Sequence, residues 1–227
     1  MKKFNLLLTT LVLVVSSCAN DGAKDNDSKN TDSAQTEINA ASGDLGLPDG
    51  SYILTKEKHL IKWAASKITG SIHSGIIVAE NGKFKVENGA INRGVVNFNM
   101  NSFEVTDIKD PESKSNFDGH LKSADFFDVE AFPVAKLIMN GSSVDGKGIA
   151  VLSFSFEMHG VAIDYNVPFT VTEVKRSEGQ MGYLISGSFM LDRTKHKMTY
   201  GSGSFFDDLG DRVINDEVKI DFEFTAI

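Results

Sequence analysis

Cysteine and proline are scarce in this chain, and each scarcity excludes a class of structure. The 227 residues contain a single cysteine, Cys18, so no disulfide can form within the chain and no cysteine-rich zinc or iron–sulfur site can be built. Four prolines stand against 16 phenylalanines. This balance favours a regular, aromatic-rich β structure over a proline-rich linker protein.

Positive charge is also in short supply. The chain has 31 acidic and 23 basic residues, a formal net charge of −8, which argues against nucleic acid as a partner.

Catalytic motifs are missing as well, since there is no G-x-S-x-G elbow, H-E-x-x-H helix, phosphate loop or dinucleotide fingerprint. Three scattered histidines, His73, His120 and His159, would have to converge in the fold to bind a metal. Asp125 and Asp128 are a candidate acid–base pair, but this spacing beside a loop is typical of turn and cap residues. We therefore predict no catalytic residue, no metal and no cofactor.

The first 17 residues have the pattern of a secretory signal peptide. A start with two lysines is followed by the apolar stretch Leu6–Val15 and two serines, which is too short for a stable membrane span. The run V-S-S-C at Val15–Cys18 resembles the lipobox of bacterial lipoproteins, in which the cysteine is acylated, for example with palmitate. The alternative is an ordinary signal peptide, with Cys18 left as a free thiol.

The lipobox resemblance implies a location. Acyl groups on Cys18 would anchor the chain to a membrane of the bacterial envelope. Because Ala19 rather than Asp follows the cysteine, we expect the outer membrane, with the chain facing the periplasm or the cell surface.

Residues 18–48 are rich in Asp, Asn, Ser, Lys and Thr and contain almost no large apolar side chain. Such a segment cannot bury enough surface to order itself, so we predict a flexible tether. Residues 49–227 remain, about 180 in number, which is enough for one domain with a sizeable core.

This domain reads as a series of short strands. Apolar and polar residues alternate over 96–100, 152–158, 161–169 and 218–224, which is typical of half-buried strands. Predicted turns separate such segments, at Asn81-Gly82, Asn88-Gly89, Asn140–Gly148 and His159-Gly160.

Counting gives about eight strands and predicts an all-β, antiparallel architecture. The strands either close into a barrel or pack as a sandwich, and periodicity does not decide between the two. A barrel of this size either holds one ligand or is filled by its own side chains.

The stretch from Phe117 to Pro133 interrupts the strand pattern. Phe117 and Leu121 are spaced i, i+4, which predicts a short helical or loop insertion near 113–130, and the charged run 107–114 before it is expected to be an exposed loop. One interpretation is an interstrand loop whose aromatic residues plug one end of a core. The other is a lid over an apolar cavity, with His120 and the acids at its polar edge.

Four segments resemble the YceI-like lipid-binding family: W-A-A-S-K through H-S-G (Trp63–Gly75), H-L-K-S-A-D-F-F-D-V-E-A-F-P (His120–Pro133), F-E-M-H-G-V (Phe156–Val161) and L-D-R (Leu191–Arg193). The resemblance covers about Ser51 to Ile227. It implies an extended, lipocalin-like antiparallel barrel whose apolar lumen holds a long isoprenoid or related amphiphilic lipid. The chain departs from the family pattern after Arg193, where it reads K-H-K-M-T-Y.

By position, the resemblance implies ligand-binding residues at a mouth loop, at a strand end and near the C-terminal strand. The strand alternation adds inward-facing residues that would line a lumen. The Arg and His members would contact a polar or phosphorylated head group, or alternatively bond to loop carbonyls at the barrel rim. The predicted set is Trp63, Phe98, Met100, His120, Asp125, Phe126, Phe127, Phe154, Phe156, His159 and Arg193.

The first hypothesis is a non-catalytic lipid carrier or scavenger anchored at the envelope. The alternatives are an enzyme that uses His120 and Asp125 on a lipid-like substrate, and a structural envelope protein with a filled core. Ligand identity and oligomeric state are left open.

Overall fold

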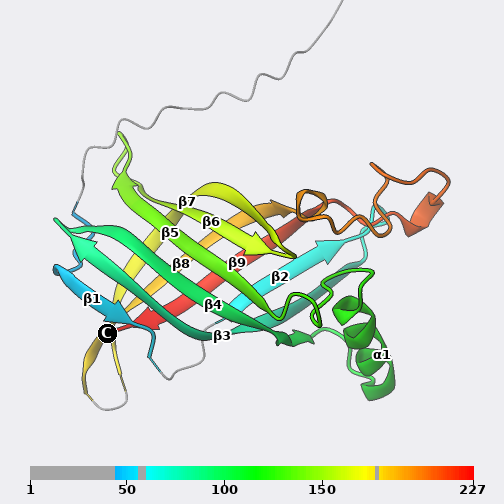
Figure 1. The fold of residues 1–227 in the computed structure, drawn as a ribbon, viewed down its shortest axis with the longest axis horizontal. Helices are drawn as coiled ribbons and strands as arrows, with labels where there is room; N and C mark the ends of the chain where they lie inside the picture. The colour runs from blue at the N-terminus through cyan, green and yellow to red at the C-terminus, as the bar shows by residue number, and fades with distance from the viewer. Residues whose placement is uncertain (1–43, 56–59, 177–178) are drawn as a thin grey trace, which may run out of the picture. The chain divides into compact units, whose positions relative to one another are not determined.

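A computed structural model describes residues 44–55, 60–176 and 179–227 (Figure 1). Every pairing between its named strands is antiparallel. Within these residues the elements are β1 (Gly50–Ile53), β2 (Leu60–Ser66), β3 (Ile72–Glu87), β4 (Ala90–Val105), α1 (Pro111–Lys122), β5 (Val134–Val144), β6 (Ala150–Met158), β7 (Val161–Lys175), β8 (Met181–Asp192), the 3₁₀ helices η1 (Arg193–His196) and η2 (Gly210–Arg212), and β9 (Glu217–Ala226).

The sheet closes into a barrel because β3 pairs with both β2 and β4. Going round from β2, the order is β9, β8, β7, β6, β5, β4 and β3. The short β1 pairs with the second half of β3, and Leu54 just beyond it bridges to Ala226 in β9. β1 and β2 thus share one place in the ring. The prediction of an antiparallel barrel of about eight strands is confirmed, and the sandwich alternative is wrong.

The inward face of the barrel follows the alternation read from the sequence. Phe98, Phe154 and Phe222 are each at most 1% exposed. Phe154 meets Phe222 and Phe189 edge to face, with ring centroids 6.1 and 5.4 Å apart. Burying one such side chain contributes about 1.5–3 kcal/mol. Much of the lumen is therefore filled by the protein's own aromatic residues.

The turn predicted at Asn81-Gly82 is wrong, and the turn predicted over Asn140–Gly148 begins only after Val144, because both Asn-Gly pairs lie inside strands. Asn81-Gly82 belongs to β3 and Asn140-Gly141 to β5. The strand register shifts at both places, so each pair forms an irregularity that bends a strand without reversing it. The turns at Asn88-Gly89 and His159-Gly160 are confirmed, with positive φ at all four residues.

Helix α1 begins inside the run 107–114 that was expected to be an exposed loop, so that expectation is wrong. The Asp110 side chain accepts a hydrogen bond from the Ser113 N–H at 2.8 Å, and Pro111 occupies the first turn. An acidic cap followed by proline is a strong start signal for a helix. The helix lies at one end of the barrel (Figure 1).

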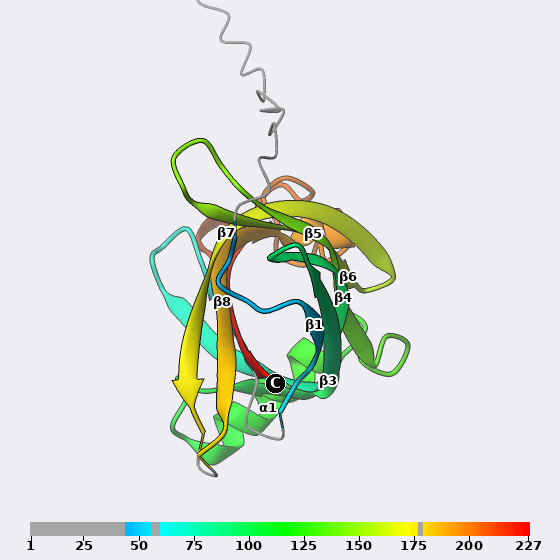
Figure 2. The same cartoon turned by 90° about the vertical axis from the view of Figure 1, so that its left-hand side faces the viewer.

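The two ends of the barrel are closed differently. At the end away from α1, the segment 44–52 crosses the barrel, with Leu47 and Tyr52 only 2% and 7% exposed (Figure 2). This segment includes residues 44–48 of the predicted tether, so the folded domain begins before the predicted boundary at 49. The other end is covered by α1, residues 123–133 and the segment that carries η1 and η2.

The predicted signal peptide (1–17), Cys18 and the tether up to residue 43 lie outside the described residues. In the part of the chain that is described, no helix is long and apolar enough to cross a membrane.

Gly75 in β3 provides a test of the packing inside the barrel. A Cβ atom at this position would lie 2.5 Å from the Trp63 ring and would also meet the Glu104 carbonyl. We expect Gly75→Ala to lower the free energy of unfolding by about 1–3 kcal/mol, as overpacked cores do, when measured by urea denaturation. The matched control is Gly119→Ala in α1, where a Cβ meets no atom within 4 Å. Equal losses in the two variants would contradict this account.

Candidate functional site

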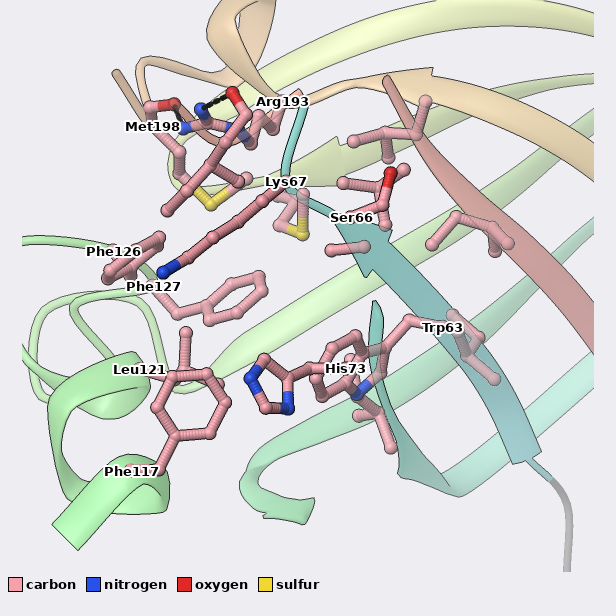
Figure 3. Close-up of a pocket in the computed structure, with 18 of the residues that line it drawn as sticks. Trp63, Ser66, Lys67, His73, Phe117, Leu121, Phe126, Phe127, Arg193 and Met198 are labelled. Carbon is pink, nitrogen blue, oxygen red and sulfur yellow. Dashed lines mark hydrogen bonds between the residues drawn. The ribbon is translucent and has the colours of Figure 1, made fainter. Parts of the chain in front are cut away.

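An apolar cavity of about 170 Å³ lies inside the barrel at the α1 end (Figure 3). It is partly open to solvent, and Lys67 and the exposed Ser71 are among the residues that line it. Its inner walls come from strands on opposite sides of the ring and include Ile61, Trp63, Ala65, Phe156, Leu191 and Ile220.

The outer side of the cavity is covered by residues 117–127, which we call the lid. α1 ends at Lys122, and the chain turns back so that the Phe127 N–H donates to the Leu121 carbonyl at 3.0 Å. This reversal directs Phe126 and Phe127 toward the barrel, where both line the cavity. The lid interpretation of this stretch therefore has a geometric basis.

An aromatic stack runs from the wall to the lid. The Trp63 and Phe103 rings have centroids 4.9 Å apart, and Phe103 and Phe127 are 4.7 Å apart. The indole N–H of Trp63 is buried and finds no acceptor among the described residues. Leaving a buried donor unpaired costs about 1–3 kcal/mol, so this wall carries an unsatisfied group.

His73 of β3 forms the polar edge of the cavity. Its Nδ1 lies 2.8 Å from the Asp107 carboxylate, whose other oxygen accepts from the Ser74 N–H at 2.9 Å. Burial acts to raise the pKa of Asp107, but the hydrogen bonds from Ser74 and His73 outweigh it, so the pKa is lowered. The imidazole also packs on Phe117, with centroids 4.7 Å apart, and so ties β3 to the lid.

Arg193 closes the cavity from the side of η1. Its guanidinium donates to the carbonyls of Met198, Tyr200, Ile214 and Asn215 at 2.7 to 3.1 Å. The remaining N–H lies 3.5 Å from the Asp216 carboxylate. A guanidinium has five N–H donors, and here all five are used within the protein. Arg193 therefore holds the loop 194–216 against the barrel.

Two histidines support the same loop. His196 is fully buried, with Nδ1 3.3 Å from the Met158 carbonyl and 3.2 Å from that of Val161. Burial lowers the pKa of His196, because the imidazolium would lose its hydration, and the two carbonyls oppose this shift only in part. His159 Nδ1 lies 3.0 Å from the His196 carbonyl and so links the β6–β7 turn to η1.

The structure brings together five of the predicted ligand-binding residues. They line one cavity, although they come from β2, the lid, β6 and η1: Trp63, Phe126, Phe127, Phe156 and Arg193. The binding roles of these residues stay predictions. For Arg193, the geometry matches the alternative in which the side chain bonds to loop carbonyls.

The other predicted residues lie elsewhere. Phe98, Met100 and Phe154 are packed in the filled part of the lumen. His120 lies outside the cavity, with its ring 5.2 Å from that of Phe126 and its Nδ1 3.9 Å from the exposed Asp125 carboxylate. His159 packs on Phe132 at the turn, and within the described ranges no three His, Cys, Asp or Glu side chains are grouped to hold a metal.

Sequence reasoning missed Lys67 and considered His73 only as a possible metal ligand, yet both border the cavity. A signal for Lys67 was present, because it directly follows β2 and continues the parity of the inward residues Ile61, Trp63 and Ala65. Met198 had no such signal, since the path of the loop 194–216 places it there.

The fold and the cavity define a closed antiparallel barrel with an apolar binding cavity at one end. The chain belongs to the YceI-like family, since the model of the YceI-like domain matches residues 30–226. No curated protein sequence matches the chain.

Solved structures are similar to this chain at low sequence identity. BcnA from Burkholderia cenocepacia has 17% identity and a TM-score of 0.56, over 74% of this chain and 96% of that chain. A polyisoprenoid binding domain from Saccharophagus degradans has 15% identity and a TM-score of 0.49, over 79% and 98%. The YCEI protein of Campylobacter jejuni has 14% identity and a TM-score of 0.47, over 88% and 97%. The likeness to BcnA shows a shared fold.

The bonding of Arg193 predicts a loss of stability on substitution. Lysine keeps the charge of Arg193 but cannot satisfy the same carbonyls, so Arg193→Lys should lower the free energy of unfolding by more than about 2 kcal/mol in urea denaturation. The control is Arg212→Lys, because Arg212 is exposed and its Nε–H donates to the Leu209 carbonyl at a longer distance of 3.4 Å. If Arg193→Lys left stability unchanged, the loop-holding role would be wrong.

The lowered pKa of His196 predicts a pH dependence of stability. The unfolded chain binds a proton near the ordinary histidine pKa of 6.5, whereas the folded chain resists it. Stability from this group is therefore complete above pH 6.5 and declines as the pH falls below it, by at most about 1.4 kcal/mol per pH unit.

Substituting His196 should remove this contribution. We expect the difference in the free energy of unfolding between the native chain and His196→Gln to shrink as the pH falls from 7.5 to 5. Urea denaturation at each pH measures this difference. A difference that grows in acid for His196→Gln would contradict the assignment.

Proposed function

We propose that this chain binds the apolar part of an amphiphilic lipid, an isoprenoid or a similar molecule, in the cavity beneath the lid. It acts without catalysis, as a carrier or scavenger, and is held at the bacterial envelope by acyl groups on Cys18. One observation carries the proposal, namely a partly open cavity whose walls are almost entirely carbon.

Such a cavity favours a hydrocarbon chain for a simple physical reason. Each methylene that leaves water contributes about 0.8 kcal/mol, so an apolar chain gains affinity without specific polar contacts. The few polar groups at the edge, at Lys67, Ser71 and His73, are placed to act on a head group. Membership of the YceI-like family supports a lipid as the ligand.

The size of the cavity sets the first step of binding. A dry cavity of about 150 Å³ accepts a benzene-sized molecule, so the present 170 Å³ admits the first carbons of a chain. A longer chain requires side chains to move. The half-buried Phe117 and Phe127 of the lid move more readily than the fully buried Phe98 and Phe154 of the filled lumen.

A structural protein with a filled core is the second candidate. The tight packing of Phe98, Phe154 and Phe222 favours it, because these side chains occupy the space that a long ligand would need. The enzyme alternative has no such support. Its proposed pair, His120 and Asp125, lies outside the cavity with the nearest atoms 3.9 Å apart.

The envelope location rests on the sequence. The basic, apolar and small-residue segments of 1–17 and the V-S-S-C run support export and acylation of Cys18. Several acyl chains would give durable anchoring, whereas a single chain binds a membrane only marginally.

Filling the cavity tests the binding role. Ala65 lines the cavity, so the Ala65→Phe side chain would occupy much of its 170 Å³. The full-length chain, carrying Cys18→Ser so that no acyl group is attached, is purified from a bacterial host and examined by native mass spectrometry with lipid extraction. We expect a bound lipid of defined mass in this protein, and its loss when Ala65→Phe is added.

Ala64→Phe is the matched control, because Ala64 is the neighbouring residue in β2 and does not line the cavity. It should keep the lipid, and urea denaturation should confirm that both phenylalanine variants fold. A chain that carries no lipid, and takes up no isoprenoid when one is offered, would overturn the proposal in favour of the filled-core protein.

A further inference from the structure

The ionisable side chains that line the cavity are all basic. They are Lys67, His73 and Arg193, and the lining contains no Asp or Glu. This is the reverse of the whole chain, in which acidic residues outnumber basic ones by 31 to 23. The electrostatic potential at the mouth therefore favours an anion, and low-polarity walls strengthen that preference.

Of the three basic groups, Lys67 is the one that has no partner among the described residues. Arg193 uses all its donors on loop carbonyls and Asp216, and His73 Nδ1 is paired with Asp107. Within residues 44–55, 60–176 and 179–227, Lys67 Nζ forms no hydrogen bond and no ion pair.

The position of Lys67 suits contact with a ligand. Its backbone is fixed, because its N–H donates to the Ser71 carbonyl at 2.9 Å, and the residue bridges to Ile214. Its side chain is half-buried and extends toward Phe126 and Phe127 of the lid (Figure 3). The apolar stem covers the cavity while the ammonium stays at its edge.

The two carboxylates that adjoin the other basic residues of the lining already have partners. Asp107 accepts from Ser74 and lies against His73, and Asp216 accepts from the Ser204 hydroxyl at 2.6 Å as well as from Arg193. A ligand that brings its own anion to the mouth would therefore meet a free cation.

We propose that Lys67 binds the anionic head group, a carboxylate or a phosphate, of a single-chain amphiphile whose tail enters the cavity toward Trp63. This inference rests on the proposed lipid-binding function and adds the charge class of the ligand. Charge-assisted hydrogen bonds between an ammonium and such a head are short and roughly twice as strong as neutral ones.

The test compares charged ligands with neutral ligands of the same tail. The full-length chain with Cys18→Ser, stripped of lipid, is titrated with hexadecanoate and hexadecanol, and with farnesyl phosphate and farnesol. We expect at least one anion to bind about ten-fold or more tightly than its alcohol. The tail that shows this preference identifies a fatty acid or an isoprenyl phosphate as the source of the head group.

Substitution of Lys67 supplies the decisive comparison. Lys67→Gln should remove the preference for the anion and leave the affinity for the alcohols within about two-fold, and Lys67→Glu should reverse it. The matched control is Lys62→Gln, because Lys62 lies five residues earlier, in β2, but is exposed, outside the cavity and paired with Glu223 at 3.0 Å. It should keep the preference.

The outcomes separate the two proposals. If alcohols and anions bind equally and Lys67→Gln changes neither, the role of Lys67 is overturned while lipid binding stands. If none of the four ligands binds the native chain, both are overturned. Equal loss of the preference in Lys62→Gln and Lys67→Gln would also overturn the assignment, because it would reflect net charge alone.

Discussion

Closure of the sheet is the constraint on which the rest of this structure depends. A strand at an open edge leaves unpaired N–H and C=O groups, and a ring of antiparallel strands removes the edge. Here β1 and β2 share one position in the ring, because both pair with β3. The strand β1, which precedes β2 in the chain, is therefore part of the closed sheet. Once the ring is closed it encloses a lumen, and that lumen must be filled by side chains or by a ligand.

The filling of the lumen is uneven along the barrel. Phe98, Phe154 and Phe222 pack its middle, and Leu47 and Tyr52 bury themselves at the end away from α1. At the α1 end the covering comes from segments outside the sheet. A lid and a loop meet the barrel only along their edges, so a cavity of about 170 Å³ remains beneath them.

The loop at that end depends on one buried cation. Arg193 gathers carbonyls that lie far apart in the loop 194–216, and this arrangement sets Met198 and Ile214 against the cavity. With Arg193 committed to the protein, Lys67 is the cation left at the mouth. A structural arginine and an available lysine thus share one site, although a sequence motif drew attention only to the arginine.

The barrel could be predicted because its signals are local. Inward residues such as Phe98 and Phe156 alternate along single strands, and this period of two survives in the burial pattern. Turn signals were less secure. An Asn-Gly pair suits a turn and a bulge equally well, and only the register with the neighbouring strand distinguishes Asn88-Gly89 from Asn140-Gly141.

The helix shows that some local signals were present but outweighed in the sequence interpretation. Asp110 and Pro111 are a cap and a first-turn residue, yet the run of charges around them suggested an exposed loop. The same holds for Lys67, which continues the inward parity of β2 but was not included in the predicted site.

The amino-acid sequence alone was enough to establish a β domain with apolar inward faces, because strand periodicity and turn chemistry act between neighbouring residues. The cavity could not be derived in that way. Its volume is the small difference between the space that the ring encloses and the space that the side chains occupy, and both depend on segments distant in the chain. Whether Phe154 fills the lumen and Phe156 borders a cavity, and whether Arg193 or Lys67 faces a ligand, was therefore decided by tertiary packing.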